Sequence, residues 1–112
     1  MTEQEIAQYN YRQIILMESR VTLYKDNKLS IKEFIDDIDA LIGWIKNPPN
    51  NWVKDLKRLL WEIEIPFATA LAHGEDLTPE KLQQISLSVD KIRECVLWYK
   101  QNCLPTLDDE NL

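Results

Sequence analysis

The sequence predicts an all-α fold, a single-domain antiparallel four-helix bundle over residues 1–104. The chain has 112 residues but only two glycines, and it is rich in residues that favour helices. Apolar residues recur at helical spacing in four segments. Short polar breaks separate these segments, at KDNK (25–28), NPPNN (47–51) and AHGEDLTP (72–79). Helices joined by such short connections pack antiparallel to one another.

The first helix is expected over residues 3–26. Its apolar residues cover a wide arc of the helical surface, so we expect contacts on more than one side. These residues include Ile6, Tyr9, Ile14, Leu16, Met17, Val21 and Tyr24.

The second helix is expected to begin at Ser30, where Ser30 and Glu33 have the spacing of a capping box. Pro48 is expected to end it, because proline disfavours the helical conformation at the preceding Asn47. One face is uniformly apolar, with Ile31, Phe34, Ile35, Ile38, Leu41, Ile42 and Ile45.

The third helix is expected to begin near Asn50 or Asn51, since either is a good N-cap. Pro66 lies inside it and predicts a kink, because proline cannot donate the bond to the carbonyl of Glu62. Gly74 is expected just past its end. The apolar stripe consists of Trp52, Leu56, Leu59, Leu60, Ile63, Phe67 and Leu71.

The fourth helix has Thr78 as its expected N-cap and Pro79 at the first helical position. Pro105 marks its expected end, and residues 105–112 form a predicted acidic tail. The apolar face consists of Leu82, Ile85, Val89, Ile92, Val96, Tyr99 and Cys103.

Net charge narrows the class of ligand. With 13 Lys and Arg against 19 Asp and Glu, the chain carries −6 and would repel nucleic acid and anionic membranes. A basic protein is the partner that this field attracts, although the same charge can serve only to keep a protein in solution. The N-terminal MTEQEIAQYN does not resemble a signal peptide, and no apolar run is long enough to span a membrane. We therefore expect a cytoplasmic protein.

The sequence contains no pattern typical of a catalytic or cofactor site. Its one histidine, His73, precedes Gly74 at a predicted helix end, where a cation is favoured. Zinc, di-iron and phosphate-loop motifs are absent, so we expect neither a cofactor nor a metal. Cys95 and Cys103 would lie about 12 Å apart on one helix, too far for a disulfide, so both are expected to be reduced. We do not expect an enzyme.

The outer face of the second helix is the principal candidate for partner binding. Glu33, Asp37 and Trp44 share one stripe opposite the apolar face, and Asp36 lies beside it. The acids repel each other by a few tenths of a kcal/mol per pair, and the stripe holds no Lys or Arg to offset them. A basic partner would relieve that repulsion, and Trp44 would anchor it. In the alternative, the nearby turn, the first helix or the tail covers Trp44.

Trp61 and Trp98 also fall outside the apolar stripes of their helices. One explanation is that some helices of the bundle touch two neighbours. The other is an apolar groove, lined by Trp61 or Trp98, through which a helical adaptor, chaperone or regulatory subunit binds its partner.

The segment KDNKLSIKEF (25–34) consists of a polar turn, a Leu-Ser pair, two further residues and Glu-Phe. In this segment and in its acidic helical character, the chain resembles bacterial toxin-immunity proteins of contact-dependent growth inhibition systems and nuclease bacteriocins. The resemblance implies a cytoplasmic protein that binds a cognate toxin domain, often a basic nuclease, and occludes its active site. It carries over no binding residue by position and indicates no oligomeric state.

Overall fold

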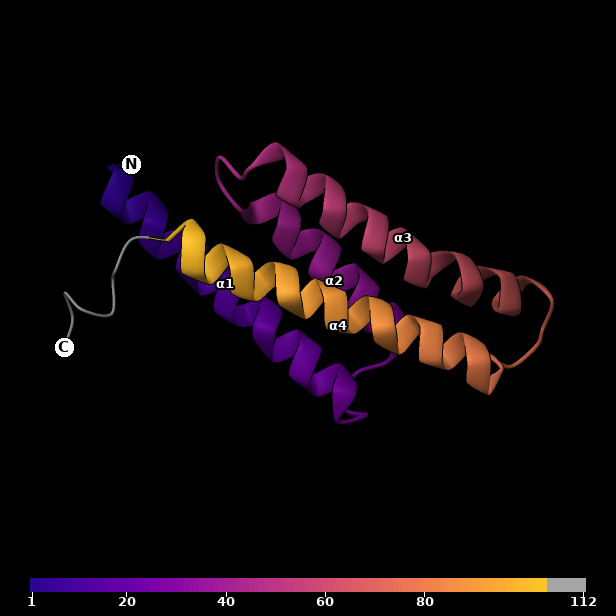
Figure 1. The fold of residues 1–112 in the computed structure, drawn as a ribbon. Coiled ribbons are helices and arrows are strands. Elements are labelled where there is room, and N and C mark those ends of the chain that lie inside the picture. Colours follow the sequence, from indigo (N-terminus) through magenta and orange to yellow (C-terminus); the bar gives the residue numbers. More distant parts are fainter. Residues whose placement is uncertain (105–112) are drawn as a thin grey trace.

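The computed structural model describes residues 1–104, whose secondary structure consists of four α-helices. Figure 1 shows them in chain order: α1 (Glu3–Lys25), α2 (Ile31–Trp44), α3 (Asn50–Ala72) and α4 (Pro79–Asn102). The predicted all-α four-helix bundle is confirmed. The predicted acidic tail and Pro105 lie outside the described residues.

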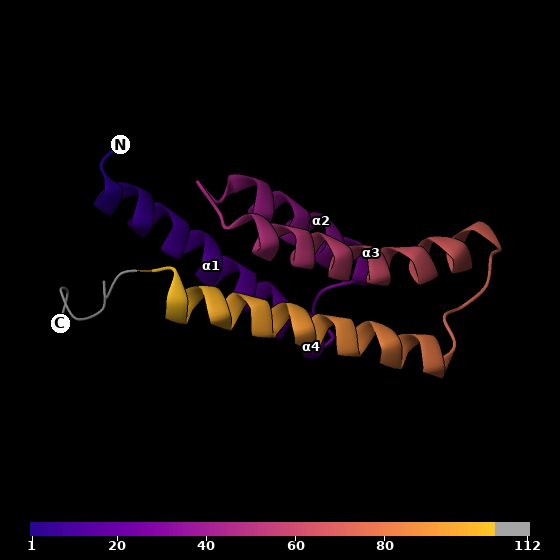
Figure 2. The ribbon, with the colours of Figure 1, turned by 45° about the horizontal axis from the view of Figure 1, so that its top comes forward.

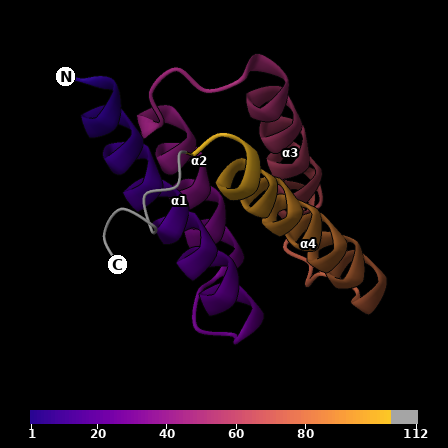
Figure 3. The ribbon, with the colours of Figure 1, turned by 60° about the vertical axis from the view of Figure 1, so that its left-hand side comes forward.

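Each helix packs against two neighbours. Helix α1 contacts α2 and α4, and α3 contacts the same two helices from the other side. Figure 3 shows α1 and α2 forming one pair of the bundle and α3 and α4 the other. The wide apolar arc predicted for α1 therefore has its explanation, because that helix is covered on two sides. Phe34, Met17, Leu56 and Ile92 are among the fully buried side chains between the helices.

Three of the four helices begin with a side-chain cap, and two of these caps, Ser30 and Thr78, were predicted. Ser30 accepts a hydrogen bond from the backbone N–H of Glu33 at 3.1 Å, and the Glu33 carboxylate accepts one from the Ser30 N–H at 3.2 Å. Thr2 and Glu5 form the same box at the start of α1. Thr78 accepts from the N–H of Lys81 at 3.2 Å, with a proline at the first helical position.

The prediction that Asn50 or Asn51 caps α3 was wrong by one position. Asn50 is the first helical residue, and Pro49 occupies the N-cap without a side-chain hydrogen bond. Pro49 has the extended conformation of an N-cap, and its carbonyl accepts from the N–H of Val53 at 3.1 Å. Helix α2 ends at Trp44, earlier than the end predicted from Pro48. Asn47, the residue before Pro48, has a left-handed φ of 53° and is not helical.

Left-handed residues close α1 and α3 in the same way. Gly74, with φ of 63°, donates to the carbonyl of Leu71, and Glu75 donates to Ala70. This pair of bonds is a Schellman motif, and it confirms the predicted role of Gly74. Asn27, with φ of 60°, closes α1 with an equivalent pair.

Pro66 lies inside α3, which continues through it to Ala72. Figure 2 shows α3 curving away from α4 over its last turns, in agreement with the predicted kink. The missing N–H and the bulk of the proline ring account for such a bend.

The α3–α4 hairpin extends beyond the turn that joins α1 to α2 (Figure 1). Between Ile63 and Ile85, only Ala70 is buried. The predictions that Leu71 and Leu82 face the core were therefore wrong, since Leu71 is 70% and Leu82 43% exposed. Both side chains lie on the part of the hairpin that extends past the α1–α2 turn, where α1 and α2 do not cover them.

Two polar side chains fix the opposite end of the bundle. The buried Asn10 amide donates to the carbonyl of Lys46 at 2.9 Å and to the Tyr99 hydroxyl at 3.3 Å. Its carbonyl oxygen accepts from the N–H of Lys46 at 2.9 Å. The Trp52 indole N–H donates to the carbonyl of Cys95 at 2.9 Å. These bonds tie α1 to the α2–α3 turn and α3 to α4.

Candidate functional site

The structure distributes the six predicted site residues over separate faces. Asp36 and Trp61 come together in a hollow between α2 and α3. Asp37 lies toward α1, since it forms an ion pair with Arg20 of that helix. Trp44 is seven residues further along α2, which places it on the same side of the helix as Asp37. Trp98 lies in a hollow between α3 and α4. The predicted single acidic face with one tryptophan is therefore two surfaces, each with its own tryptophan.

The α2–α3 hollow combines acids with an exposed tryptophan. It has a volume of about 300 Å³, and Trp61 beside it is 63% exposed. Among the described residues, Asp39 and Glu64 have no ion-pair partner, and Lys57 is the only base in the lining. Ile35, Asp36, Asp39, Lys57, Leu60, Trp61 and Glu64 line it. Three carboxylates against one ammonium give this hollow a net charge of −2.

The acids of α2 are less crowded than the sequence suggested, because cations reach them from beside the stripe. Lys32 pairs with Asp36 at 2.9 Å, and Arg20 pairs with Asp37 at 3.0 Å. Glu33 is engaged in the capping box of α2. The prediction that these acids need an external partner to relieve their repulsion is corrected accordingly.

Trp44 is 56% exposed at the end of α2. The described part of α1 and the following turn leave more than half of it open, so the local-packing alternative accounts for only part of its surface. It lies outside the hollows around Trp61 and Trp98.

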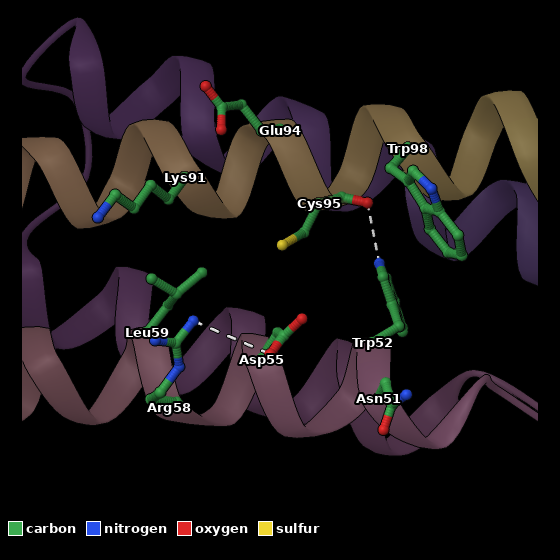
Figure 4. Close-up of a pocket in the computed structure, with 9 residues that line it drawn as sticks. All are labelled: Asn51, Trp52, Asp55, Arg58, Leu59, Lys91, Glu94, Cys95 and Trp98. Atoms are coloured by element: carbon green, nitrogen blue, oxygen red, sulfur yellow. Dashed lines mark hydrogen bonds and ion pairs between the residues drawn. The ribbon is translucent and has the colours of Figure 1, made fainter.

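The hollow around Trp98 has a largely apolar lining. Figure 4 shows it between α3 and α4, with the indoles of Trp52 and Trp98 at one end and the Cys95 thiol pointing into it. Its volume is about 480 Å³, within the range of small-ligand pockets. Trp98 is 46% exposed, whereas Trp52 is buried. Charged groups of both signs surround this apolar floor: Asp55, Arg58, Lys91 and Glu94.

A second hollow continues along the same two helices toward Pro66. It shares Lys91 with the first, and Ile65 and Leu87, both about half exposed, lie along it. Ser88 donates to the Glu62 carboxylate at 3.3 Å on its floor. Leu87 and Trp98 are eleven residues apart and share one face of α4, but Ile65 belongs to α3, and the register of α3 against α4 cannot be read from spacing.

The two thiols have little nucleophilic character. Burial raises the pKa of Cys95, and the nearby carboxylates of Asp55 and Glu94 raise it further. Burial likewise raises the pKa of Cys103. Both cysteines are free, as predicted, and both pack against the core. Thiols that stay protonated are poor nucleophiles and poor metal ligands.

Within residues 1–104, no three or more His, Cys, Asp and Glu side chains come together as a metal site would require. None of the helices described has the length and apolar character needed to cross a bilayer. In comparisons with known proteins, the chain matches no family model, no curated protein and no solved structure.

Proposed function

We propose that this chain is a protein-binding inhibitor of the immunity type, which neutralises a basic toxin domain in the cytoplasm by occluding its active site. Two lines of support meet in this proposal. One is the resemblance of residues 25–34 and of the overall acidic helical character to toxin-immunity proteins. The other is the surface between α2 and α3.

The observation that carries the proposal is the exposed indole of Trp61 beside the acidic hollow. An exposed tryptophan supplies a large apolar contact, and this residue type is enriched among the few that dominate interface energetics. Asp39 and Glu64 next to it have no ion partner within residues 1–104. Lysines or arginines of a partner would find unpaired carboxylates around an apolar anchor.

The ion pairs already present on α2 do not prevent such binding. Lys32 and Asp36 are both more than half exposed, and an exposed pair of this kind contributes about 0–1 kcal/mol. A basic partner can therefore displace Lys32 at little cost. The net charge of −6 would also accelerate the encounter with a basic surface.

The test begins with capture of the partner and ends with its toxicity. Tagged chain is used to purify bound protein from the native host at low salt. The captured protein is then expressed in a heterologous bacterium with and without the chain. We expect growth arrest when it is expressed alone and recovery when the chain is co-expressed.

A matched pair of variants locates the surface. Asp36→Lys combined with Trp61→Ala should lose both capture and rescue, because it reverses a charge and removes the anchor. Asp37→Lys combined with Trp44→Ala makes the same chemical change on the α1 side and should retain both. A captured protein that does not inhibit growth would refute the immunity function, and the reverse pattern of variants would place the interface at Trp44.

A second candidate function is that of a helical adaptor whose groove around Trp98 holds an apolar partner segment. The apolar floor and the volume of about 480 Å³ favour it. Salt separates the two functions, because charge-driven association slows steeply with ionic strength and apolar burial responds little. Binding that is unchanged between 50 and 500 mM NaCl would favour the groove.

A further inference from the structure

The two hollows between α3 and α4 form one continuous face. Both contain Lys91, and together they extend from Asn51 at the start of α3 to Thr69 near its end. Three exposed apolar side chains lie along this length: Ile65 at 50%, Leu87 at 54% and Trp98 at 46%. Isolated exposed apolar residues are ordinary, but a row of them along a hollowed face is typical of an interaction surface.

The net charge of this face differs from that of the chain as a whole. Its lining contains three acids and three bases and is therefore neutral, in a chain whose net charge is −6. The acids are Asp55, Glu62 and Glu94, and the bases are Arg58, Lys81 and Lys91. The α2–α3 hollow, with a net charge of −2, does not have this balance.

We propose that the α3–α4 face binds a second copy of this chain, forming a two-fold symmetric dimer. In such an interface the same patch meets itself, so it must offer both signs of charge and an apolar centre. Two chains of −6 repel each other overall, and a neutral face adds no further net like-charge repulsion where the two copies meet. A basic partner would find no net negative charge on this face to attract it.

The estimated size of the face is that of a weak, transient interface. From residue 51 to residue 69 the helix rises about 27 Å, and two helix diameters span about 20 Å. The buried area is then roughly 500 Å² per copy, at the low end for specific interfaces. We therefore expect a dissociation constant in the micromolar range and a monomer–dimer equilibrium rather than a permanent dimer.

Sedimentation velocity tests the proposal on the full chain between 5 and 500 µM. A reducing agent is present throughout, so that Cys95 cannot cross-link two copies. We expect the sedimentation coefficient to rise with concentration from the monomer value toward the dimer value. Leu87→Ser with Trp98→Ala should weaken the dimer at least tenfold, and because both side chains are exposed the variant should fold. Trp44→Ala on α2 is the control and should leave the equilibrium unchanged.

Charge reversal gives a signature that only a self-complementary face would show. Lys91→Glu makes the face −2, Glu94→Lys makes it +2, and each variant alone should dimerise at least tenfold more weakly. An equimolar mixture of the two should recover the dimer, since opposite faces then meet.

A wild type that remains monomeric at 500 µM would overturn the proposal and leave the groove to a different protein. So would a dimer that tolerates Leu87→Ser with Trp98→Ala, or a mixture that stays monomeric. The outcome is independent of the immunity function, because that function uses Asp36 and Trp61 between α2 and α3.

Discussion

Replacement of Asn10 by alanine is the sharpest test of how the bundle is held at its α2–α3 turn. The amide of Asn10 forms both hydrogen bonds with the backbone of Lys46, donating to the carbonyl and accepting from the N–H, each at 2.9 Å. It also donates to the Tyr99 hydroxyl at 3.3 Å. A single side chain thus joins α1, the turn and α4, and alanine removes all three bonds at once.

The expected loss follows from the surroundings of each bond. The two bonds to Lys46 are only partly buried, so water can replace them, and each is worth about 1 kcal/mol. Tyr99 is buried, and its hydroxyl loses a donor there, which costs about a further 1 kcal/mol. The free energy of unfolding should therefore fall by about 3 kcal/mol. With a urea m-value of about 1.5 kcal/mol/M, the unfolding midpoint should fall by about 2 M.

Urea unfolding followed by tryptophan fluorescence measures this loss. Asn102→Ala is the matched control, because its amide makes one exposed bond, to the carbonyl of Trp98 within α4. That variant should lose no more than about 0.5 kcal/mol. If Asn10→Ala costs no more than Asn102→Ala, the three bonds do not hold the turn, and the argument from their geometry is wrong.

Three further predictions concern other parts of the fold. Gly74→Ala should lower the free energy of unfolding by about 1 kcal/mol in thermal or urea unfolding. The added methyl meets no atom within 4 Å, so the loss comes from the φ of 63°, which alanine tolerates poorly. Trp52→Phe should cost about 1–2 kcal/mol in the same assay, since it removes the bond to the carbonyl of Cys95 and leaves space beside Tyr99. The free energy of unfolding should decline as the pH rises above about 9. Burial in the folded protein raises the pKa of two thiols, whose usual value is 9.0, and of two tyrosines, so these groups lose their protons more readily in the unfolded chain.

Each of these predictions has its own control. Gly43 lies within α2 with the same open space around it, so Gly43→Ala should stabilise the protein by about 0.5–1 kcal/mol. Trp61→Phe, on the surface, should be close to neutral. In the alkaline range, the thiols ionise first in the unfolded chain, which is therefore favoured as the pH rises. The double variant Cys95→Ala with Cys103→Ala should make the decline of the free energy of unfolding with pH less steep. Stability that rises above pH 9 would contradict the sign of the shifts.

Helix positions could be predicted from the sequence because their signals are local. Ser30 and Thr78 cap helices through bonds to residues three positions away, and Gly74 supplies the conformation that ends α3. Pro49 was missed as a cap because its role depends on its backbone conformation and not on a side-chain acceptor.

Burial was less predictable, because periodicity identifies a helical face without showing whether a neighbour covers it. Leu71 and Leu82 have the spacing of core residues and are exposed all the same. The outer face of α2 was misjudged for a similar reason. Arg20 lies on another helix, so nothing in the spacing of α2 could reveal its pairing with Asp37, or that Asp36 and Trp61 share a hollow.

The overhanging end of the α3–α4 hairpin has a consequence for the way the molecule opens. With Ala70 alone buried between Ile63 and Ile85, very little apolar contact holds that end closed. Helical segments with so little burial open in small, independent fluctuations, whereas a core helix such as α2 opens only with global unfolding. Amide hydrogen exchange should therefore divide α3 near Pro66 into a slow N-terminal part and a fast C-terminal part. One continuous helix would then belong to two cooperative units.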